Sequence, residues 1–247
     1  MKIHTLGTGH GDASPYHLSS ATLLEVDNRF YLIDCADGTE GMLIQRGVDA
    51  AQLTAVFVTH LHLDHTAGLP AIMKRRIKYR KHFPDTRTTY VLPDRNAFAI
   101  LEQWIAINGY PDTGHLVFQD ASDGYSDEVL EMIAYPNRHL ASVKGNSFSF
   151  LFKAARKKLF FTGDLSPDFS DFSFDIADGC DLVICELTHF PLETALPILS
   201  KLRIGRLLFN HLGKVAQSEQ GRKRILSQLE ELPYPAEIAS DGSVWEI

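Results

Sequence analysis

Short apolar runs rich in branched and aromatic residues alternate along the chain with longer segments whose apolar positions recur at helical spacing. The short runs are typical of buried strands, and the longer segments predict amphipathic helices. Strands are expected within residues 21–26, 29–35, 53–60, 88–93, 115–120, 129–137, 147–154, 157–164, 181–190, 203–213 and 236–247. Helices are expected within residues 66–83, 94–110, 192–202 and 217–232, and Pro197 predicts a kink or a break in the third of them.

The order of these elements predicts the fold class. Residues 21–26 and 29–35 flank Asp27 and Asn28, a turn-forming pair, and therefore predict a β-hairpin. Strands with inserted helices recur in both halves of the chain, and no repeat or linker separates the halves. The pattern predicts one α/β domain, residues 1–247: an αββα four-layer sandwich of two mixed β-sheets flanked by helices.

Composition narrows the class of protein. The 247 residues suffice for a substantial core, and 45% hydrophobic with 22% charged residues is ordinary globular composition. The net charge of −7 argues against a general nucleic-acid binder. Three cysteines do not suggest a disulfide framework; they indicate a reducing compartment and are expected in the core. Because neither a signal peptide nor a membrane-spanning run is visible, we expect a cytoplasmic protein with no membrane partner.

The densest group of titratable residues is the stretch HLHLDH, residues 60–65. In extended chain its alternation would turn the imidazoles to one side and Leu61 and Leu63 to the other, into the core. Surface histidines on a loop are the alternative, but this spacing directly after a buried strand favours a metal site. The stretch offers four candidate ligands: His60, His62, Asp64 and His65.

Three further candidate ligands, His139, Asp164 and His211, each follow or end a predicted strand. Each alone is more typical of a structural side chain, but together with the stretch they form a coherent set of seven. Imidazole and carboxylate donors suit zinc, iron or manganese, and a set without cysteine argues against a structural zinc finger.

This set resembles the ligand signature of the metallo-β-lactamase superfamily of hydrolases, HxHxDH followed in order by the three later positions. Asp34, in YLIDCADGT, is similar to the family's aspartate on the strand before the signature. The stretches LGTG, SSATLLEV, LIDCADGTEGMLIQRG and VFVTHLHLDHTAGLP resemble the tRNase Z-like branch most closely. The resemblance extends from Leu6 to His211 and implies the sandwich fold of that family.

The resemblance implies two divalent metal ions, expected to be zinc, with manganese or iron as alternatives. His60, His62 and His139 would hold one ion, Asp64, His65 and His211 the other, and Asp164 would bridge both. A hydroxide between two such ions is a nucleophile at neutral pH, and Asp64 is the candidate acceptor of the water's proton. Asp34 would accept the N–H of a ligand imidazole, and a turn-forming aspartate is its alternative role.

These features predict a dinuclear metal-dependent hydrolase whose leading substrate is a phosphodiester, either RNA or a small or cyclic phosphodiester. A thioester or lactone hydrolase on the same metal core is the alternative, because the fold does not determine the substrate. A redox protein and a non-catalytic metal-binding module belong to other classes. His62 argues against a redox protein, since redox members of the superfamily carry glutamate at that position. The complete set of seven ligands argues against a non-catalytic module.

Two departures from tRNase Z bear on the substrate. In tRNase Z a long flexible arm that grips tRNA lies between the third histidine and the bridging aspartate, whereas only the 24 residues 140–163 lie there in this chain, enough for one hairpin. No counterpart of the HST motif follows CELTHF. Both departures argue against precursor-tRNA cleavage. Glu186 and His189 are the candidate catalytic substitutes for the missing proton relay, and a solvated glutamate with a packed histidine is the alternative.

Further polar residues are candidate substrate contacts. His10 and His17 lie in the glycine-rich stretch GTGHGDASPYH, and Lys144 lies in SVKGNS. The segment KRRIKYRK, residues 74–81, carries six cations at a predicted helix end. It is interpreted either as a solvated helix end or as a contact for a phosphate backbone. A second copy of the chain is a further candidate partner.

Overall fold

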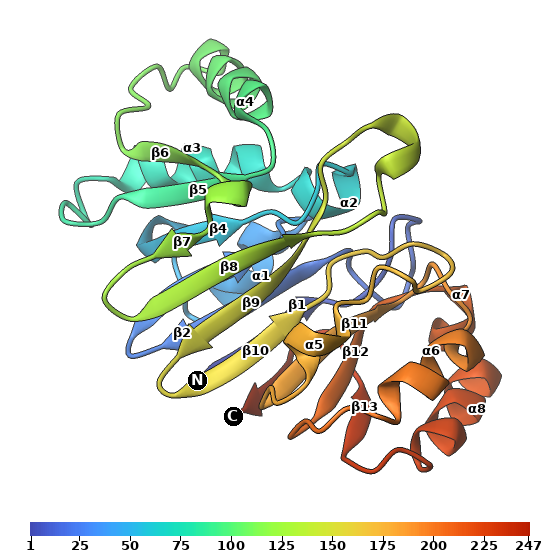
Figure 1. The fold of residues 1–247 in the computed structure, drawn as a ribbon. Coiled ribbons are helices and arrows are strands. Elements are labelled where there is room, and N and C mark those ends of the chain that lie inside the picture. Colours follow the sequence, from blue (N-terminus) through green and yellow to red (C-terminus); the bar gives the residue numbers. More distant parts are fainter.

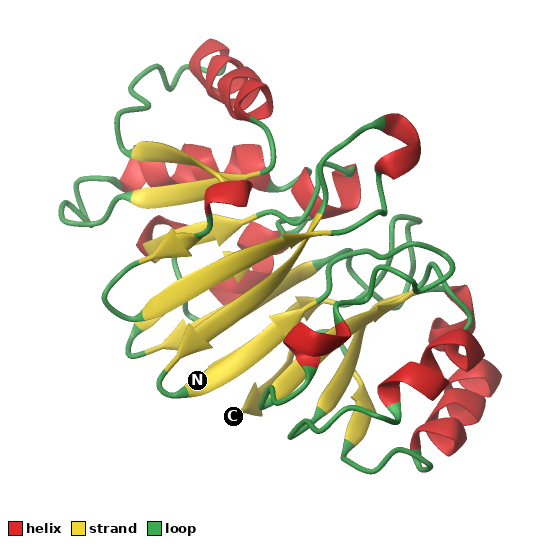
Figure 2. Ribbon diagram, in the orientation of Figure 1, coloured by secondary structure: helices red, strands yellow, loops and turns green.

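Two seven-stranded sheets pack face to face between two layers of helices in the computed structural model, which describes residues 1–247 (Figures 1 and 2). Antiparallel and parallel pairs occur in both sheets. The predicted αββα sandwich of two mixed sheets is confirmed. No helix of the structure combines the length and apolar character that crossing a membrane requires.

The first sheet has the strand order β14-β1-β2-β3-β4-β5-β6. Pairs from β14 to β3 are antiparallel, and pairs from β3 to β6 are parallel. The predicted hairpin is present, and Asp27 and Asn28 both have positive φ, as its tight two-residue turn requires. The strands are β1 (Lys2–Gly7), β2 (Ala21–Val26), β3 (Arg29–Ile33), β4 (Leu53–Phe57), β5 (Thr88–Leu92), β6 (Leu116–Asp120) and β14 (Ser243–Glu246).

The second sheet has the strand order β13-β12-β11-β10-β9-β8-β7. Pairs from β13 to β10 are parallel, and pairs from β10 to β7 are antiparallel. The strands are β7 (Tyr125–Ser126), β8 (Leu130–Pro136), β9 (Phe148–Ala154), β10 (Lys157–Phe161), β11 (Leu182–Leu187), β12 (Leu207–Leu212) and β13 (Ala236–Ile238).

The last twelve residues differ from the prediction of one strand or hairpin, because β13 belongs to the second sheet and β14 to the first. The chain changes layers between them. Ala239 N–H donates to the carbonyl of Phe209 in one sheet, and Gly242 N–H donates to the carbonyl of Thr5 in the other. Hydrophobic pattern alone does not reveal such a crossing, since each short strand finds its partner far away in sequence.

Helices cover the outer face of each sheet (Figure 2). Asp94 caps α4 by accepting from Ala97 N–H, at the predicted start of that helix. Pro197 lies inside α6, which ends two residues later. The helices are α1 (Thr39–Gln45), α2 (Leu63–Thr66), α3 (Leu69–Tyr79) and α4 (Arg95–Ile107) in the first half, and α5 (Phe174–Ala177), α6 (Leu192–Leu199), α7 (Lys214–Gln217) and α8 (Glu219–Leu229) in the second. Single 3-10 turns occupy Ala50–Gln52, Ala121–Asp123 and Ala141–Val143.

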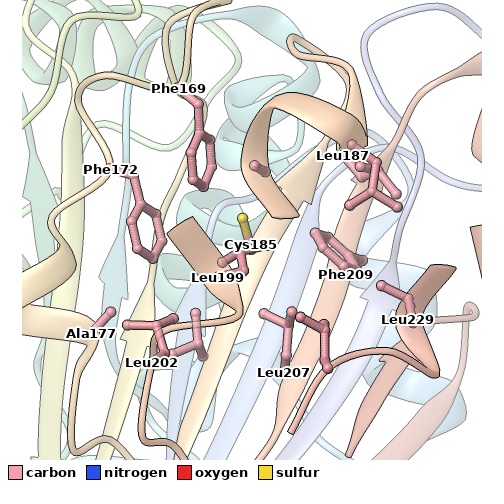
Figure 3. Close-up of a cluster of buried hydrophobic side chains, with 14 of the residues drawn as sticks. Phe169, Phe172, Ala177, Cys185, Leu187, Leu199, Leu202, Leu207, Phe209 and Leu229 are labelled. Atoms are coloured by element: carbon pink, nitrogen blue, oxygen red, sulfur yellow. The ribbon is translucent and has the colours of Figure 1, made fainter. Parts of the chain in front are cut away.

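Alternate residues of the central strands face different cores, as the pleat of a strand requires. Tyr31 and Ile33 of β3 point into the core between the sheets, and Leu32 points into the core beneath α1, α3 and α4. The core between the second sheet and helices α6 and α8 includes Cys185 and Phe209 (Figure 3). All three cysteines are free and buried, as predicted.

A single carboxylate near the C-terminus anchors the loop between β1 and β2, residues 8–20. Asp241 Oδ1 accepts from the N–H and the hydroxyl of Thr8 at 2.9 and 2.6 Å, and Oδ2 accepts from Leu18 N–H at 2.6 Å. His17 Nδ1 lies 2.8 Å from the Thr8 hydroxyl. These contacts hold the loop beside the carboxyl ends of the parallel strands, where the candidate ligands gather.

Candidate metal centre

The carboxyl ends of parallel strands from both sheets meet at one edge of the sandwich, which is where α/β folds place their ligands. Each polar residue predicted from a strand end lies at this edge. Asp34 follows β3, the HLHLDH stretch follows β4, and Asp164 follows β10. Glu186 is the last but one residue of β11, and His211 lies inside β12. His139 arrives from the antiparallel strand β8.

The HLHLDH stretch is not the extended strand that its alternation predicted. β4 ends at Phe57, and α2 begins at Leu63. His60 is fully buried, whereas Leu61 is 37% and Leu63 77% exposed, so the expectation that the leucines enter the core is wrong. Once the chain leaves the sheet, the two-residue alternation of a strand no longer applies, and the irregular turn buries His60 and His65 but leaves His62 exposed.

Asp164, almost completely buried, lies at the centre of the group. Its Oδ2 is 3.6 Å from His60 Nε2, 3.5 Å from His65 Nε2 and 3.7 Å from His139 Nε2. Its Oδ1 is 3.6 Å from His211 Nδ1. One carboxylate therefore faces four imidazoles that come from three different segments of the chain.

The remaining contacts place the predicted ligand atoms in two groups, and a third, overlapping group joins Asp164 and His211 to His189. In the first, His139 Nε2 lies 3.3 Å from His62 Nδ1, with His60 and Asp164 close by. In the second, Asp64 Oδ2 lies 3.2 Å from His211 Nε2 and 3.4 Å from His65 Nε2. Within each group the candidate ligand atoms all lie within 4.8 Å of one another.

These residues fit divalent metal ions. Bonds of about 2.0–2.2 Å to a tetrahedral ion separate neighbouring ligand atoms by roughly 3.3–3.6 Å, close to the separations found here. His60 Nε2 and Asp164 Oδ1 are buried and have no hydrogen-bond partner. Leaving such an atom unpaired costs about 1–3 kcal/mol, which coordination would offset. The nitrogen and oxygen donors are those preferred by zinc, manganese and iron.

A β-bulge aims His211. The pairing of β11 with β12 shifts register at this residue, whose φ of 47° is in the left-handed region. A non-glycine residue there costs of order 1–3 kcal/mol and persists only when its surroundings hold it. Thr188 Oγ1 lies 3.1 Å from His211 Nδ1, so a hydrogen bond at Nδ1 also fixes the orientation of this ring. The bulge thus turns a strand residue towards Asp64 and Asp164.

Asp34 holds a second ring. It is fully buried, has a φ of 56°, and its Oδ2 lies 2.7 Å from His65 Nδ1. Thr59 donates its N–H to Asp34 Oδ1 at 2.9 Å, and its hydroxyl lies 3.1 Å from His60 Nδ1. Such contacts leave the opposite ring nitrogen free for a metal. The sequence does not reveal these roles of Thr59 and Thr188, because a threonine beside a histidine carries no signal of which ring it will contact.

The electrostatics of His60 and Asp64 favour the protonation states that bind metal. Burial, together with the neighbouring His65, lowers the pKa of His60 to about 2, so this imidazole is neutral at physiological pH. Burial alone would raise the pKa of Asp64, but hydrogen bonds from His211 and His65 outweigh it and hold that pKa below its usual value. Neutral imidazoles and ionised carboxylates are the forms that coordinate. For His65, burial would lower the pKa, but the charges of Asp164 and Asp34 outweigh burial and raise it.

Glu186 and His189 form a hydrogen-bonded pair beside the candidate ligands. Glu186 is 3% exposed, which excludes the solvated glutamate of the alternative interpretation. Its oxygens accept from the N–H groups of Leu165, Thr188 and His189 at 2.6–3.0 Å, and both lie 3.0 Å from His189 Nδ1. Burial lowers the pKa of His189, but the hydrogen bond and charge of Glu186, with the charge of Asp164, outweigh burial and raise that pKa.

The three candidate substrate contacts lie in different surroundings. His10 lines a cavity of about 560 Å³ together with His189. His17 is turned towards Thr8 and Asp241, whose Oδ1 is 3.5 Å from its Nδ1. Lys144 is exposed and follows the 3-10 turn after His139. Of the three, His10 faces open space beside the ligands.

The basic segment 74–81 matches neither of its interpretations fully. Arg76 is completely buried and donates to three backbone carbonyls, two of them in the loop that follows α3. Arg75 pairs with Asp49 at 2.7 Å, and Arg80 pairs with Asp112 at 3.2 Å. A solvated helix end is therefore wrong for Arg76, because that loop folds back and presents its carbonyls to the guanidinium.

A family model of the metallo-beta-lactamase superfamily matches residues 15–209. The chain belongs to this superfamily. The predicted resemblance is thereby confirmed, and the two groups of ligand atoms lie where the HxHxDH signature and its later partners converge.

Relatives by sequence include proteins named Ribonuclease Z. Ribonuclease Z of an Exiguobacterium species is 41% identical over 76 residues, which span 31% of this chain but only 25% of that relative. Ribonuclease Z of Macrococcus caseolyticus is 25% identical over 272 residues, spanning 86% of this chain and 88% of that relative.

Solved structures show the same superfamily fold. The metallo-beta-lactamase fold protein YhfI of Bacillus subtilis has a TM-score of 0.78 at 18% identity and covers 100% of this chain and 99% of its own. The short form of human tRNase Z, ELAC1, has a TM-score of 0.75 at 21% identity, with coverages of 100% and 99%.

Proposed function

We propose that this superfamily member is a metal-dependent phosphodiesterase with two divalent ions, zinc first and manganese or iron as alternatives. The observation that carries the proposal is the convergence of seven imidazole and carboxylate side chains with Asp164 at their centre, where His60 Nε2 and Asp164 Oδ1 are buried and unpartnered. Relatives named ribonuclease Z and a human relative named zinc phosphodiesterase support the phosphodiester class and zinc.

The two groups of ligand atoms suggest how the ions divide the residues. We assign His60, His62 and His139 to one ion, Asp64, His65 and His211 to the other, and Asp164 to both. When bound, such ions polarise a phosphoryl oxygen and lower the pKa of a water molecule to about 7. The residues of this chain then position the substrate and move protons.

Asp64 is the proposed proton acceptor. Its carboxylate lies at the rim of the ligand group, beside His65 and His211, and its lowered pKa keeps it ionised at neutral pH. A carboxylate that is ionised and within reach of the attacking water can take its proton as the new bond to phosphorus forms. Asp64 therefore combines the roles of ligand and base.

His189 is the proposed proton donor, and Glu186 positions it. Three backbone amides fix the Glu186 carboxylate, which accepts from His189 Nδ1 and leaves Nε2 as the nitrogen that can donate. The raised pKa of His189 favours the protonated ring, which can protonate the leaving oxygen. Glu186 is itself buried, so it acts through His189 and does not touch substrate.

The segment between His139 and Asp164 limits the substrate. It forms one hairpin, β9 and β10, as the sequence predicted, and a single 3-10 turn precedes this hairpin. No long arm extends from it to grip a tRNA body. We therefore propose RNA without an arm contact, or a small or cyclic phosphodiester, as the substrate class.

Metal analysis and hydrolysis of bis(p-nitrophenyl) phosphate test this function. We expect about two transition-metal ions per chain and activity that a chelator removes and zinc restores. His60→Ala should abolish activity, whereas His82→Ala, at an exposed histidine, is the matched control. Activity that survives both chelation and His60→Ala would contradict the proposal. Parallel assays of a thioester and a lactone address the alternative substrates, and sedimentation analysis addresses the expected homodimer.

A further inference from the structure

A cavity of about 560 Å³ lies beside the proposed metal ligands, bounded by the segment after β11, the loop after β1 and helices α7 and α8, which cluster together in Figure 1. His189 and Thr188 line its inner end, and His10 lines the side formed by the loop. His189 Nδ1 is 3.9 Å from Asp164 Oδ2, and Thr188 contacts His211. The cavity therefore begins where the ligand set ends.

Apolar side chains form the walls of this cavity. Leu187, Phe190 and Ile225 line it and also belong to the outer core of the second sheet, where Leu187 is seen beside Phe209 (Figure 3). Val215 of α7 lines it as well and is 65% exposed, at the cavity mouth. A volume of this size with apolar walls and a few polar groups is typical of sites that bind small molecules.

The charges around the cavity cancel in pairs. Lys214 Nζ lies 2.8 Å from Asp12 Oδ2, and Arg224 forms an ion pair with Glu193. No cation among the lining residues lacks a carboxylate partner. A strand of nucleic acid crossing this surface would need free cations for its successive phosphates. The paired charges favour an occupant that is uncharged apart from the phosphate at the ligands.

We infer that this cavity binds the uncharged ester group of the substrate, an aromatic group next to the scissile phosphate. The inference rests on the proposed function, because the ligand set places the phosphate at the inner end. His10 and His189 border the junction between phosphate and ester group. The chain then prefers phosphodiesters with an aromatic ester, and a simple aryl group and a nucleoside are the two sources of that chemistry.

Equilibrium binding of phosphate monoesters tests the cavity without turnover. Zinc-loaded protein is titrated calorimetrically with methyl phosphate, phenyl phosphate and adenosine 5′-monophosphate, which share one phosphate group. We expect phenyl phosphate to bind about tenfold or more tightly than methyl phosphate, since the ring buries apolar surface. If adenosine 5′-monophosphate binds more tightly than phenyl phosphate, the ester group is a nucleoside. If it binds more weakly than phenyl phosphate, the ester group is a simple aryl group. Equal binding of methyl and phenyl phosphate would overturn the inference.

Filling the cavity provides the second test. Val215→Trp should remove the preference for phenyl phosphate and leave methyl phosphate binding unchanged. Val244→Trp makes the same substitution at an exposed position of β14 and should keep the preference. Gln228→Trp fills the cavity from α8 should the first variant fail to fold by circular dichroism. A preference that persists in the folded cavity variants contradicts the inference.

The two proposals fail in different ways. If no phosphodiester is hydrolysed but phenyl phosphate still binds preferentially and Val215→Trp removes that preference, the proposed function fails and the cavity assignment stands. If diesters are hydrolysed but alkyl and aryl monoesters bind equally, the proposed function stands and the cavity assignment fails.

Discussion

Replacing Asp34 by asparagine isolates one hydrogen bond behind the proposed metal ligands. Asparagine keeps the shape of the side chain and one oxygen, which can still accept from Thr59 N–H, now 2.9 Å from Asp34 Oδ1. Its amide NH₂ would face His65 Nδ1, which lies 2.7 Å from Asp34 Oδ2. A donor there favours the tautomer that protonates Nε2, the nitrogen nearest Asp64 and Asp164. Asparagine tolerates a φ of 56°, so the variant adds no backbone strain.

The expected magnitude follows from the burial of this pair. Loss of a partner behind a metal-bound histidine weakens metal binding about 10- to 100-fold. That range corresponds to roughly 1.4–2.7 kcal/mol of binding free energy. We expect the upper half of the range, because Asp34 is fully buried and His65 is 1% exposed, so water cannot replace the lost acceptor.

Competition between the protein and a chromophoric zinc chelator measures this effect directly. The matched control is Glu25→Gln, which changes another carboxylate in contact with an imidazole, His4 Nε2 at 3.2 Å, far from the proposed ligands. Zinc affinity should fall in Asp34→Asn and stay unchanged in Glu25→Gln. If Asp34→Asn is folded by circular dichroism and binds zinc as tightly as the parent, the assignment of His65 as a ligand oriented by Asp34 is refuted.

Three further outcomes are expected. His189→Gln should slow hydrolysis of alkyl phosphodiesters about 10²- to 10⁴-fold but spare p-nitrophenyl esters, whose leaving group needs no proton; equal losses would exclude a proton donor. Asp127→Asn should lower the free energy of unfolding by about 1.5–3 kcal/mol at pH 7, because Asp127 accepts from two amides and two phenols. Burial would raise the Asp127 pKa, but these donors hold it below 3.8, so urea unfolding should show the difference above that pH and lose it as the pH falls through the folded-state pKa. Gly68→Ala should destabilise by about 1–3 kcal/mol in thermal unfolding, since a Cβ would lie 2.2 Å from the Ala36 carbonyl oxygen, whereas Gly41→Ala, which meets no atom within 4 Å, should be neutral or stabilising.

Local chemistry explains the predictions from sequence that the structure confirms. Neighbouring residues alone determine the turn at Asp27 and Asn28 and the helix cap at Asp94. Both features can therefore be predicted from a short stretch of sequence. The sandwich follows from the rhythm of strands and helices. Candidate ligands at several strand ends lie together because parallel strands bring their carboxyl ends to one edge.

Long-range packing decided what the sequence did not show. Leu61 and Leu63 are exposed because β4 ends earlier than its apolar run. Arg76 is buried because a later loop supplies carbonyls to it. Thr188 reaches His211 only because β11 and β12 are neighbours in the second sheet. The residues that contact Arg76 and Thr188 lie in other segments of the chain, and no local sequence pattern specifies where those segments lie.

The anchoring of the loop after β1 by Asp241 bears on how the protein is made. A ribosome releases residues 8–20 more than two hundred positions before Asp241, the residue that fixes them. The loop that carries His10 therefore lacks this one acceptor until the segment that holds Asp241 has emerged and its flanking strands have joined both sheets. Until Asp241 is in place, the backbone N–H groups of Thr8 and Leu18 would lack their shared acceptor, so this loop would be held less firmly. Partly made chains would carry most of the proposed metal ligands but lack this anchor for one side of the cavity.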